Sequence, residues 1–321
     1  MTDYKGIKGF TIPNVSSDPA NLMQGQIWYN STSGTLKAAV PGVGAWASGN
    51  DMTGIYGMRF GFGTLTAGMC AGGNPGAGTN SQTYDGTSWT DVNNINTGRS
   101  NEAGNGSGTT SAGLIYKNQT EAYNGTSWSE VSAAMNTDRS SLSGNGTQTA
   151  TIAMGGSTGG PSGYKNLTES WNGASWTVEN ILNTTRSGAT SLGVQGAAIY
   201  AGGYTGAASS DKAEEWNGTG WTEISSLNTA RNNQLSRGGT VADGLVAGGY
   251  GGGARLGNTE TWNGTSWTEA ADLAVGRYAV AGQGTGAAAF AAGGNNPSDN
   301  YTAVTEEWSA PDTATVTITT S

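Results

Sequence analysis

The sequence predicts an all-β protein, a six-bladed β-propeller that follows a short N-terminal arm and β-hairpin. Three observations predict this fold: one motif recurs along the chain, its spacing is regular, and glycine and aromatic residues are abundant. The 321 residues include 55 Gly, 11 Trp and 12 Tyr, and only 12% are charged. Disordered chains are usually richer in charge and poorer in aromatic residues, so this composition favours a folded, turn-rich protein.

The recurring motif is an aromatic residue, Asn-Gly, two small residues and a tryptophan. Its copies begin at Tyr84 (with Asp-Gly), Tyr123, Trp171, Trp216 and Trp262. An arginine follows each copy about ten residues later, and we align the units on Arg59, Arg99, Arg139, Arg186, Arg231 and Arg277. The intervals of 40, 40, 47, 45 and 46 residues are those of an array of small structural units.

Each unit predicts four strands. A glycine-bearing stretch follows the arginine, and a short run of small apolar residues then ends in a Gly pair, except in the second unit. A variable stretch, Glu-x-aromatic, the Asn-Gly turn and the later Trp complete the unit. The apolar run is too short for a helix and suits a buried strand. Asn-Gly between two aromatic-bearing segments is a strong hairpin signal.

The repeated polar and aromatic residues have structural roles in this interpretation. The tryptophans are expected to bury large apolar areas between neighbouring sheets. We expect the arginine to span neighbouring blades by bonding main-chain carbonyls or the repeated glutamate. A four-stranded unit of this length is typical of a propeller blade.

The order Arg, Gly-Gly, Glu-x-aromatic and later Trp resembles the Kelch repeat over residues 59–308. This resemblance implies a Kelch-like propeller of six blades. How the ring closes stays open, because the last unit ends at Trp308 without the final hairpin motif. The outer strand could come from residues 313–319 or from the segment around Trp46, and residues 26–58 could instead form a partial seventh blade.

Residues 1–52 do not follow the repeat, and we assign them to an N-terminal arm and hairpin, with the propeller at 53–321. Residues 27–37 predict a hairpin, with an aromatic strand, a Ser/Gly turn and a short second strand. Its role is either attachment to a larger assembly or closure of the ring. The candidate attachment residues are Phe10, Trp28 and Tyr29.

Residues 24–37, together with the Trp-Asn-Gly-Thr-Ser-Trp repeats, resemble structural proteins of tailed phages, those of marine cyanobacteria in particular. The resemblance implies a virion protein, in the tail or its fibres, that is made in the host cytoplasm. The expected partners are other virion proteins, host surface glycan and further copies of the chain in a symmetric ring or oligomer. The alternatives are a capsid decoration protein and a cellular carbohydrate- or protein-binding propeller. The N-terminus lacks a signal-peptide apolar region, which agrees with this expectation.

Composition argues against several other functions. The net charge of −9 and the scattered basic residues disfavour nucleic acid as a partner. No apolar run reaches 18 residues, so no membrane span is predicted. The chain has no histidine, and we predict no metal, cofactor or catalytic residues. Hydrolysis by paired carboxylates is the enzymatic alternative, but the repeated glutamates have the regularity of structural residues.

Candidate binding residues lie in the variable stretches after the Gly pairs, which we expect to cluster on one face. Loops that depart from a repeat often carry function, and Tyr, Asn and Gly make adaptable contact surfaces. The alternative is that these stretches are only solvated turns. The candidates are Tyr164, Lys165, Tyr204, Asp211, Tyr250, Arg255, Asp299 and Tyr301.

Overall fold

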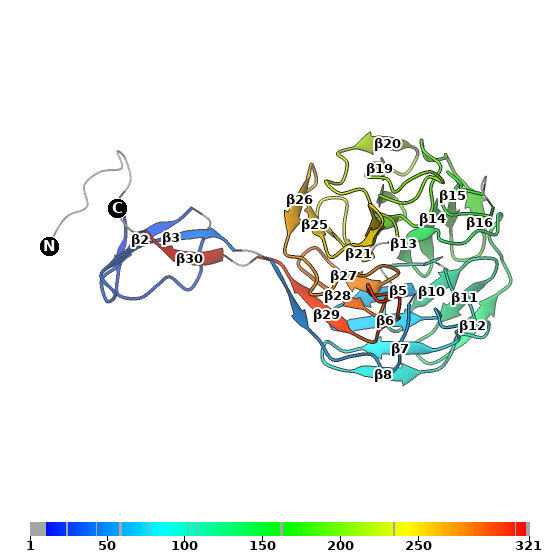
Figure 1. Cartoon of the computed structure of the whole chain (residues 1–321), viewed down its shortest axis with the longest axis horizontal. Helices are drawn as coiled ribbons and strands as arrows, with labels where there is room; N and C mark the ends of the chain where they lie inside the picture. The colour runs from blue at the N-terminus through cyan, green and yellow to red at the C-terminus, as the bar shows by residue number, and fades with distance from the viewer. Residues whose placement is uncertain are drawn as a thin grey trace. The chain divides into compact units, whose positions relative to one another are not determined.

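The computed structural model of the chain describes residues 11–23, 25–42, 44–57, 60–76, 78–101, 103–106, 108–160, 163–233, 235–311 and 313–318. The chain divides into two compact units (Figure 1). One contains Met1–Gly44 and Ala310–Ser321, and the other is Ala45–Ser309. All regular elements in the described ranges are β-strands, which confirms the predicted all-β class.

The larger unit is a propeller with six groups of four strands, counted over the described residues. Blade one contains β5 (Phe60–Thr64), β6 (Ala67–Ala71), β7 (Ser81–Tyr84) and β8 (Trp89–Val92). Blade two contains β9 (Ala103–Gly104), β10 (Gly113–Tyr116), β11 (Thr120–Tyr123) and β12 (Trp128–Val131). Blade three contains β13 (Ser143–Thr147), β14 (Ala150–Met154), β15 (Thr168–Trp171) and β16 (Trp176–Val178).

The remaining blades follow the same order. Blade four contains β17 (Thr190–Val194), β18 (Ala197–Ala201), β19 (Ala213–Trp216) and β20 (Trp221–Ile224). Blade five contains β21 (Leu235–Gly239), β22 (Gly244–Ala247), β25 (Thr259–Trp262) and β26 (Trp267–Ala270), with a small hairpin of β23 (Tyr250–Gly251) and β24 (Ala254–Arg255). Blade six contains β27 (Ala281–Gly284), β28 (Ala288–Ala292), β29 (Thr305–Ser309) and β4 (Ala45–Ser48).

The first strands of neighbouring blades contact one another in a closed ring that runs from β5 through β9, β13, β17, β21 and β27 back to β5. One parallel pair, Gly238 with Gly284, joins the sheets of blades five and six. Within each blade the strands are antiparallel, so the first and third connections lie at one edge, which we call the turn face. The second connection and the link to the next blade lie at the opposite edge, which we call the loop face.

The outer-strand tryptophans join neighbouring blades as well as filling space between them. Trp176 Nε1 donates a hydrogen bond of 3.1 Å to Thr120 Oγ1, and Trp221 Nε1 donates one of 3.0 Å to Thr168 Oγ1. Each acceptor is the first residue of the third strand in the preceding blade. Blade four begins that strand with Ala213, which has no hydroxyl, and the next tryptophan donates to a main-chain carbonyl instead.

The repeated arginine and glutamate form a buried ion pair in blades two to six. In blade four, Arg186 Nη2 lies 2.9 Å from Glu214 Oε1, and the same guanidinium donates to the carbonyls of Lys212 and Tyr200. The predicted bonds to carbonyls and to the repeated glutamate are confirmed, but the prediction that the arginine side chain spans neighbouring blades is wrong. Its side chain stays within its own blade, and its main-chain carbonyl makes the link to the preceding blade by accepting from Gly156 N at 3.0 Å. The pairs are Arg99–Glu121, Arg139–Glu169, Arg186–Glu214, Arg231–Glu260 and Arg277–Glu306.

Blade one departs from this pattern in two described residues, and Arg59, on which we aligned it, lies outside the described residues. The main-chain link that Arg186 and its counterparts make to the preceding blade is made by Tyr56, whose carbonyl accepts from Gly294 N at 2.8 Å. Gln82 stands in the third strand where the other blades have glutamate. The main-chain equivalent of Arg186 in blade one is therefore Tyr56, three positions before Arg59 in the sequence.

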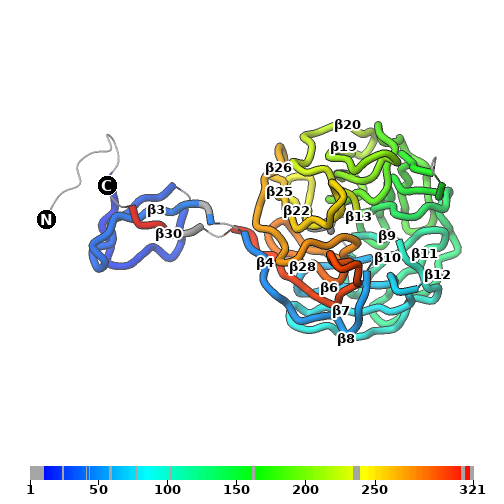
Figure 2. Tube along the Cα trace, in the orientation of Figure 1, coloured from blue at the N-terminus to red at the C-terminus, as the bar shows by residue number. Residues whose placement is uncertain are grey.

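The ring is closed by the N-terminal segment. β4 pairs antiparallel with β29, with Trp46 opposite Trp308 (Figures 1 and 2). Trp46 Nε1 donates to Thr259 Oγ1 at 2.9 Å, so Trp46 takes the place of the repeated outer-strand tryptophan. The alternatives, closure by residues 313–319 and a seventh blade, are not what the structure shows. The boundary expected after residue 52 falls after Gly44, and Ala310–Ser321 belongs to the smaller unit.

The smaller unit is a four-stranded sheet in the order β1-β2-β3-β30. Its strands are β1 (Asn14–Val15), β2 (Ile27–Asn30), β3 (Thr35–Pro41) and β30 (Thr313–Thr317), so the predicted hairpin is β2–β3. Asp18 organises this unit by accepting hydrogen bonds from Trp28 Nε1 and Asn30 Nδ2 and pairing with Lys37 Nζ at 2.6 Å. Trp28 is fully buried.

Candidate binding sites of the propeller

The predicted binding residues lie on the loop face, where several of them contact one another across blades. Tyr164 of blade three packs edge-on against Tyr204 of blade four, with ring centroids 5.6 Å apart. Tyr301 of blade six accepts a hydrogen bond of 3.2 Å from Asn74 Nδ2 of blade one. The four residues are half-buried. These loops therefore form interblade contacts in addition to covering the surface.

Arg255 is the centre of the largest of these contacts, which joins blades five and six. Its guanidinium carbon lies 5.5 Å from the Tyr278 ring centroid, and Tyr278 in turn packs edge-on against Tyr250 at 5.9 Å. The guanidinium also donates to Asn295 Oδ1 and forms an ion pair with Asp299. Asp299 is 77% exposed, so the group ends in a carboxylate at the surface. We call Tyr250, Arg255, Tyr278, Asn295 and Asp299 the Arg255 cluster.

Two predicted loop residues have main-chain roles. Lys165 N donates to the carbonyl of Gly156 at 2.8 Å, and the Asp211 carbonyl accepts from Leu227 N at 2.8 Å. Both are half-buried, and neither belongs to the Arg255 cluster. Most of the loop candidates are thus brought together in interblade groups, and sequence reasoning missed Tyr278 and Asn295, which complete the largest one.

The attachment candidates belong to the smaller unit. Phe10 lies outside the described residues. Trp28 is a core residue whose indole is bonded to Asp18, and Tyr29 beside it in β2 is half-buried. The hydrogen bonds of Asp18 to Lys37, Asn30 and Trp28 lower the pKa of its carboxyl group to about 2. The contacts of this aromatic strand with Asp18 therefore stabilise the fold of the smaller unit itself.

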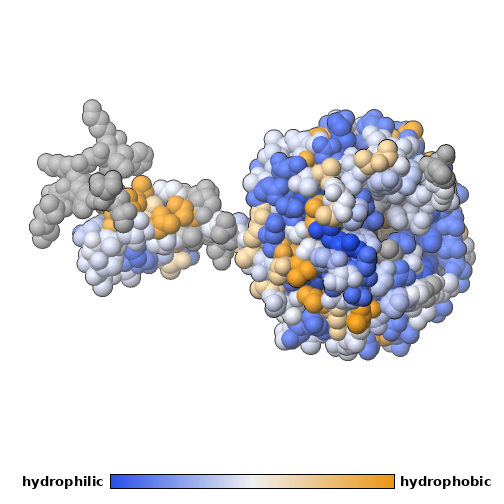
Figure 3. All heavy atoms as spheres, in the orientation of Figure 1, coloured by the Kyte–Doolittle hydropathy of each residue, from blue (hydrophilic) through white to orange (hydrophobic). Residues whose placement is uncertain are grey.

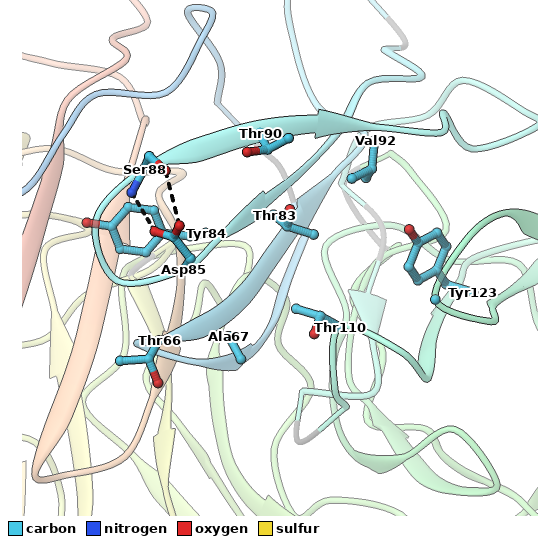
Figure 4. Close-up of a pocket in the computed structure, with 11 residues that line it drawn as sticks. Thr66, Ala67, Thr83, Tyr84, Asp85, Ser88, Thr90, Val92, Thr110 and Tyr123 are labelled. Carbon is cyan, nitrogen blue, oxygen red and sulfur yellow. Dashed lines mark hydrogen bonds between the residues drawn. The ribbon is translucent and has the colours of Figure 1, made fainter.

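A pocket of about 320 Å³ opens on the turn face between blades one and two (Figure 4). The turns of blade one supply Asp85 and Ser88, and Tyr123 comes from blade two. Asp85 is the Asp-Gly variant of the repeated turn, and its carboxylate accepts from Thr87 N and Ser88 N. The residues that line the pocket are Thr66, Ala67, Thr83, Tyr84, Asp85, Ser88, Thr90, Val92, Thr110, Tyr123 and Gly125.

The ionisable groups of this pocket have definite protonation states. The main-chain N–H groups of Ser88 and Thr87 lower the pKa of Asp85, which is therefore a carboxylate over the physiological range. Burial raises the pKa of Tyr84, as does its hydrogen bond to Glu307, and burial raises the pKa of Tyr123. Both phenols are therefore neutral. Among the described residues that line the pocket, none is Lys or Arg.

Sequence reasoning did not predict this pocket, although one signal was visible in the Asp-Gly variant at residue 85.

In the part of the chain that the structure describes, no three Asp, Glu, Cys or His side chains gather as metal ligands would. The described residues also include no helix with the length and apolarity needed to cross a bilayer. The face of the propeller seen in Figure 3 is mostly hydrophilic, with scattered apolar patches.

Comparison with known proteins supports the fold class and goes no further. No family model matches the chain, and no curated protein matches it. Among solved structures, the chain is similar to one titled "Structure of YjhT", with a TM-score of 0.68 and 12% sequence identity. The match covers 85% of this chain and 97% of that one. At this identity the similarity shows a shared β-propeller fold, so the chain is a β-propeller protein.

Proposed function

We propose that this protein is a non-enzymatic structural and recognition component of a tailed-phage virion, in the tail or its fibres. In this proposal the propeller is Kelch-like, and its loop face binds host surface glycan or a neighbouring virion protein. The sequence resemblance of residues 24–37 and of the repeats supports the virion role. The smaller unit, which has its own sheet and its own buried tryptophan, is the part we assign to attachment.

The observation that carries the recognition role is the Arg255 cluster. Binding loses affinity when side chains must be ordered at the interface, and a surface that is already fixed avoids that cost. Interblade contacts hold Tyr250, Arg255 and Tyr278 in place before any partner arrives. Tyrosine and arginine, together with tryptophan, are also enriched among the residues that dominate binding energy. The exposed carboxylate of Asp299 adds a polar contact point.

Carboxylate geometry supports binding over hydrolysis. Hydrolysis of glycosides normally uses two carboxyl groups about 5–9.5 Å apart. The repeated glutamates of blades two to six are each occupied in a buried ion pair with arginine. The turn-face pocket has one lining carboxylate, Asp85, among its described residues. These carboxylates therefore have structural or binding roles in the proposal.

The test is electron microscopy of intact phage particles labelled with an antibody against this chain. Label at the distal tail or on its fibres is expected. The purified chain should also compete with phage for adsorption to host cells, and Arg255→Ala should weaken that competition at least tenfold. Thr222→Ala, on the exposed outer strand of blade four, is the matched control and should compete like the native chain. Absence of label from every particle would refute the virion role.

A further inference from the structure

The pocket on the turn face exists because one interblade notch is not filled. We define an interblade notch as the gap between the first turn of one blade and the strand ends of the preceding blade. Between blades two and three, Gln148 Nε2 fills it by donating to the carbonyls of Gly113 and Tyr123, at 2.9 and 2.8 Å. Gln195 does the same between blades three and four, with the carbonyls of Thr151 and Trp171.

Other residues fill three further notches. Val241 stands at the position of the glutamine between blades four and five, and it packs against the apolar core there. Leu65 packs in the same way between blades six and one. Between blades five and six the position is Gly286, and the carboxylate of Asp243 occupies the space that a Gly286 side chain would need. A filled notch is therefore the rule in the described part of the ring.

The notch between blades one and two is different because the first turn of blade two is longer. Gly106 precedes Gly113 by seven positions, whereas the corresponding residues of blade three, Gly146 and Thr151, are five positions apart. The two additional residues place Thr110 at the notch, and a threonine is too short to reach the strand ends as Gln148 does. The result is the pocket of about 320 Å³.

A second departure from the repeat occurs at the same pocket. The four other hairpin turns of this type begin with asparagine, whose Oδ1 accepts main-chain N–H groups, as Asn124 does. Asp85 makes the same turn, so the fold does not require the charge. Its second oxygen, Oδ2, accepts from Ser88 Oγ at 3.2 Å (Figure 4). A carboxylate thus replaces an amide at the one described notch that is open.

The lining selects the chemistry of the ligand. Besides Tyr84 and Tyr123, five serine and threonine side chains line the pocket, and each of their hydroxyl groups can both donate and accept hydrogen bonds. They are Thr66, Thr83, Ser88, Thr90 and Thr110. Asp85 can only accept, and it disfavours an anionic ligand because no basic side chain is present in the described lining. A volume near 300 Å³ is at the lower end for small-molecule sites. A neutral ligand rich in hydroxyl groups meets all these conditions.

We infer that the notch between blades one and two is a binding site for a neutral saccharide unit, held by Asp85 and the surrounding hydroxyl groups. This site lies on the turn face, opposite the loop face that carries the proposed recognition function. It does not depend on the Arg255 cluster or on a virion role.

Saturation-transfer NMR on the full chain tests this inference, with D-glucose, D-galactose, D-mannose and N-acetyl-D-glucosamine as separate probes. At least one of the four should receive saturation from the native chain, and D-glucuronate should not. Thr110→Gln restores the side chain that fills the neighbouring notches, and it should reduce the transfer at least fivefold. Asp85→Asn restores the turn residue of the other blades, and it should weaken binding about tenfold because a charge-assisted hydrogen bond is lost.

Two further variants keep the result interpretable if Thr110→Gln does not fold. Thr83→Val removes one lining hydroxyl at nearly constant volume and should also reduce the transfer. Thr222→Ala, on the exposed outer strand of blade four, is outside both sites and should leave it unchanged. No transfer to any of the four neutral sugars would overturn the inference, as would transfer that persists in Thr110→Gln, Asp85→Asn and Thr83→Val. Transfer lost only in Arg255→Ala would place sugar binding on the loop face and would also overturn it.

Discussion

Blade one and blades two to six solve the same structural problem with different chemistry. In the five later blades, an arginine donates to main-chain carbonyls and pairs with a buried glutamate. In blade one, Gln82 stands at the position of the glutamate and donates to Asp91 Oδ1 at 2.7 Å and to Thr53, and Tyr56 makes the main-chain link to the preceding blade. The comparison shows that the third strand of a blade requires a satisfied polar side chain at this position and does not require a glutamate.

The physical reason is the cost of a buried charge that has lost its partner. Replacing a complete buried ion pair by neutral groups is often tolerated, whereas removing one partner leaves an uncompensated charge. Arg186 and Glu214 are both almost fully buried. Burial lowers the pKa of Arg186, and it raises the pKa of the neighbouring Tyr200 to about 12. The buried surroundings therefore disfavour an isolated charge, and Arg186 and Glu214 are stable there only as a pair.

The largest expected effect is from breaking the pair in blade four. Arg186→Met leaves Glu214 buried without its cation, and we expect the free energy of unfolding to fall by about 3–5 kcal/mol. Denaturant unfolding followed by tryptophan fluorescence measures it. The double variant Arg186→Met, Glu214→Gln removes both charges and should recover part of the loss. A double variant less stable than Arg186→Met would contradict the comparison.

A somewhat smaller effect is expected from placing a charge in blade one. Gln82→Glu puts a carboxyl group beside the carboxylate of Asp91, which accepts from Gln82 at 2.7 Å, and the expected loss is about 1–3 kcal/mol at neutral pH. The burial and the neighbouring carboxylate would raise the folded-state pKa of the new group above its unfolded value of about 4.3. Its destabilising effect should therefore be absent at low pH and appear as the pH rises through that range. Unfolding measured between pH 4 and 8 checks this, and the control is Asn118→Asp, at an exposed loop position.

The interblade tryptophan bonds provide a third comparison, between blade four and the others. Thr120→Val leaves the Trp176 indole N–H without its acceptor, and we expect a loss of about 1–2 kcal/mol. Ala213→Val in blade four should show no such loss from hydrogen bonding, because Trp267 already donates to the Ser225 carbonyl. Thermal unfolding of both variants makes the comparison. Equal losses would mean that the hydroxyl acceptor has no stabilising role.

The smallest effect concerns the smaller unit, where Asp18 is the organising charge. Its folded-state pKa of about 2 lies below the ordinary value, so its contribution to stability is present above about pH 4. That contribution is lost as the pH falls toward 2. NMR of the Trp28 indole N–H, which is bonded to Asp18, should report the change. Asp18→Asn should remove the dependence, and a titration that is the same in both chains would refute the assignment.

Much of the propeller could be predicted because its determinants are local and repeated. Trp-Asn-Gly turns, Gly pairs and small apolar strands recur often enough that each confirms the others. The Arg–Glu pair could also be predicted from the sequence, since both residues recur at fixed places. Blade one was harder to align because its main-chain link is made by Tyr56 and its third strand has Gln82 in place of glutamate. Only main-chain hydrogen bonds, such as the one from Gly294 N to the Tyr56 carbonyl, show that Tyr56 has the main-chain position of the repeated arginine.

The ring closure and the turn-face pocket could not be read from the repeat in the same way. Two segments, around Trp46 and at residues 313–319, had suitable strand patterns, and alternation does not say which partner a strand chooses. The pocket depends on the length of one turn and on the absence of one glutamine at Thr110. Asp85 was visible as a variant, but its neighbours across the blade boundary were not. Loop-face groups such as the Arg255 cluster likewise depend on contacts between blades.

The closing strand β4 also has a consequence for the order of folding. Its partner β29 follows it by some 260 positions, so blade six cannot be completed until almost the whole propeller has been synthesised. The sheet of the smaller unit has the same property, because β3 pairs with β30. Pairings of such long sequence separation form late and slowly. A chain whose synthesis stops before β29 therefore has neither a closed ring nor a complete small sheet. Only a fully synthesised chain can complete the folding of both units.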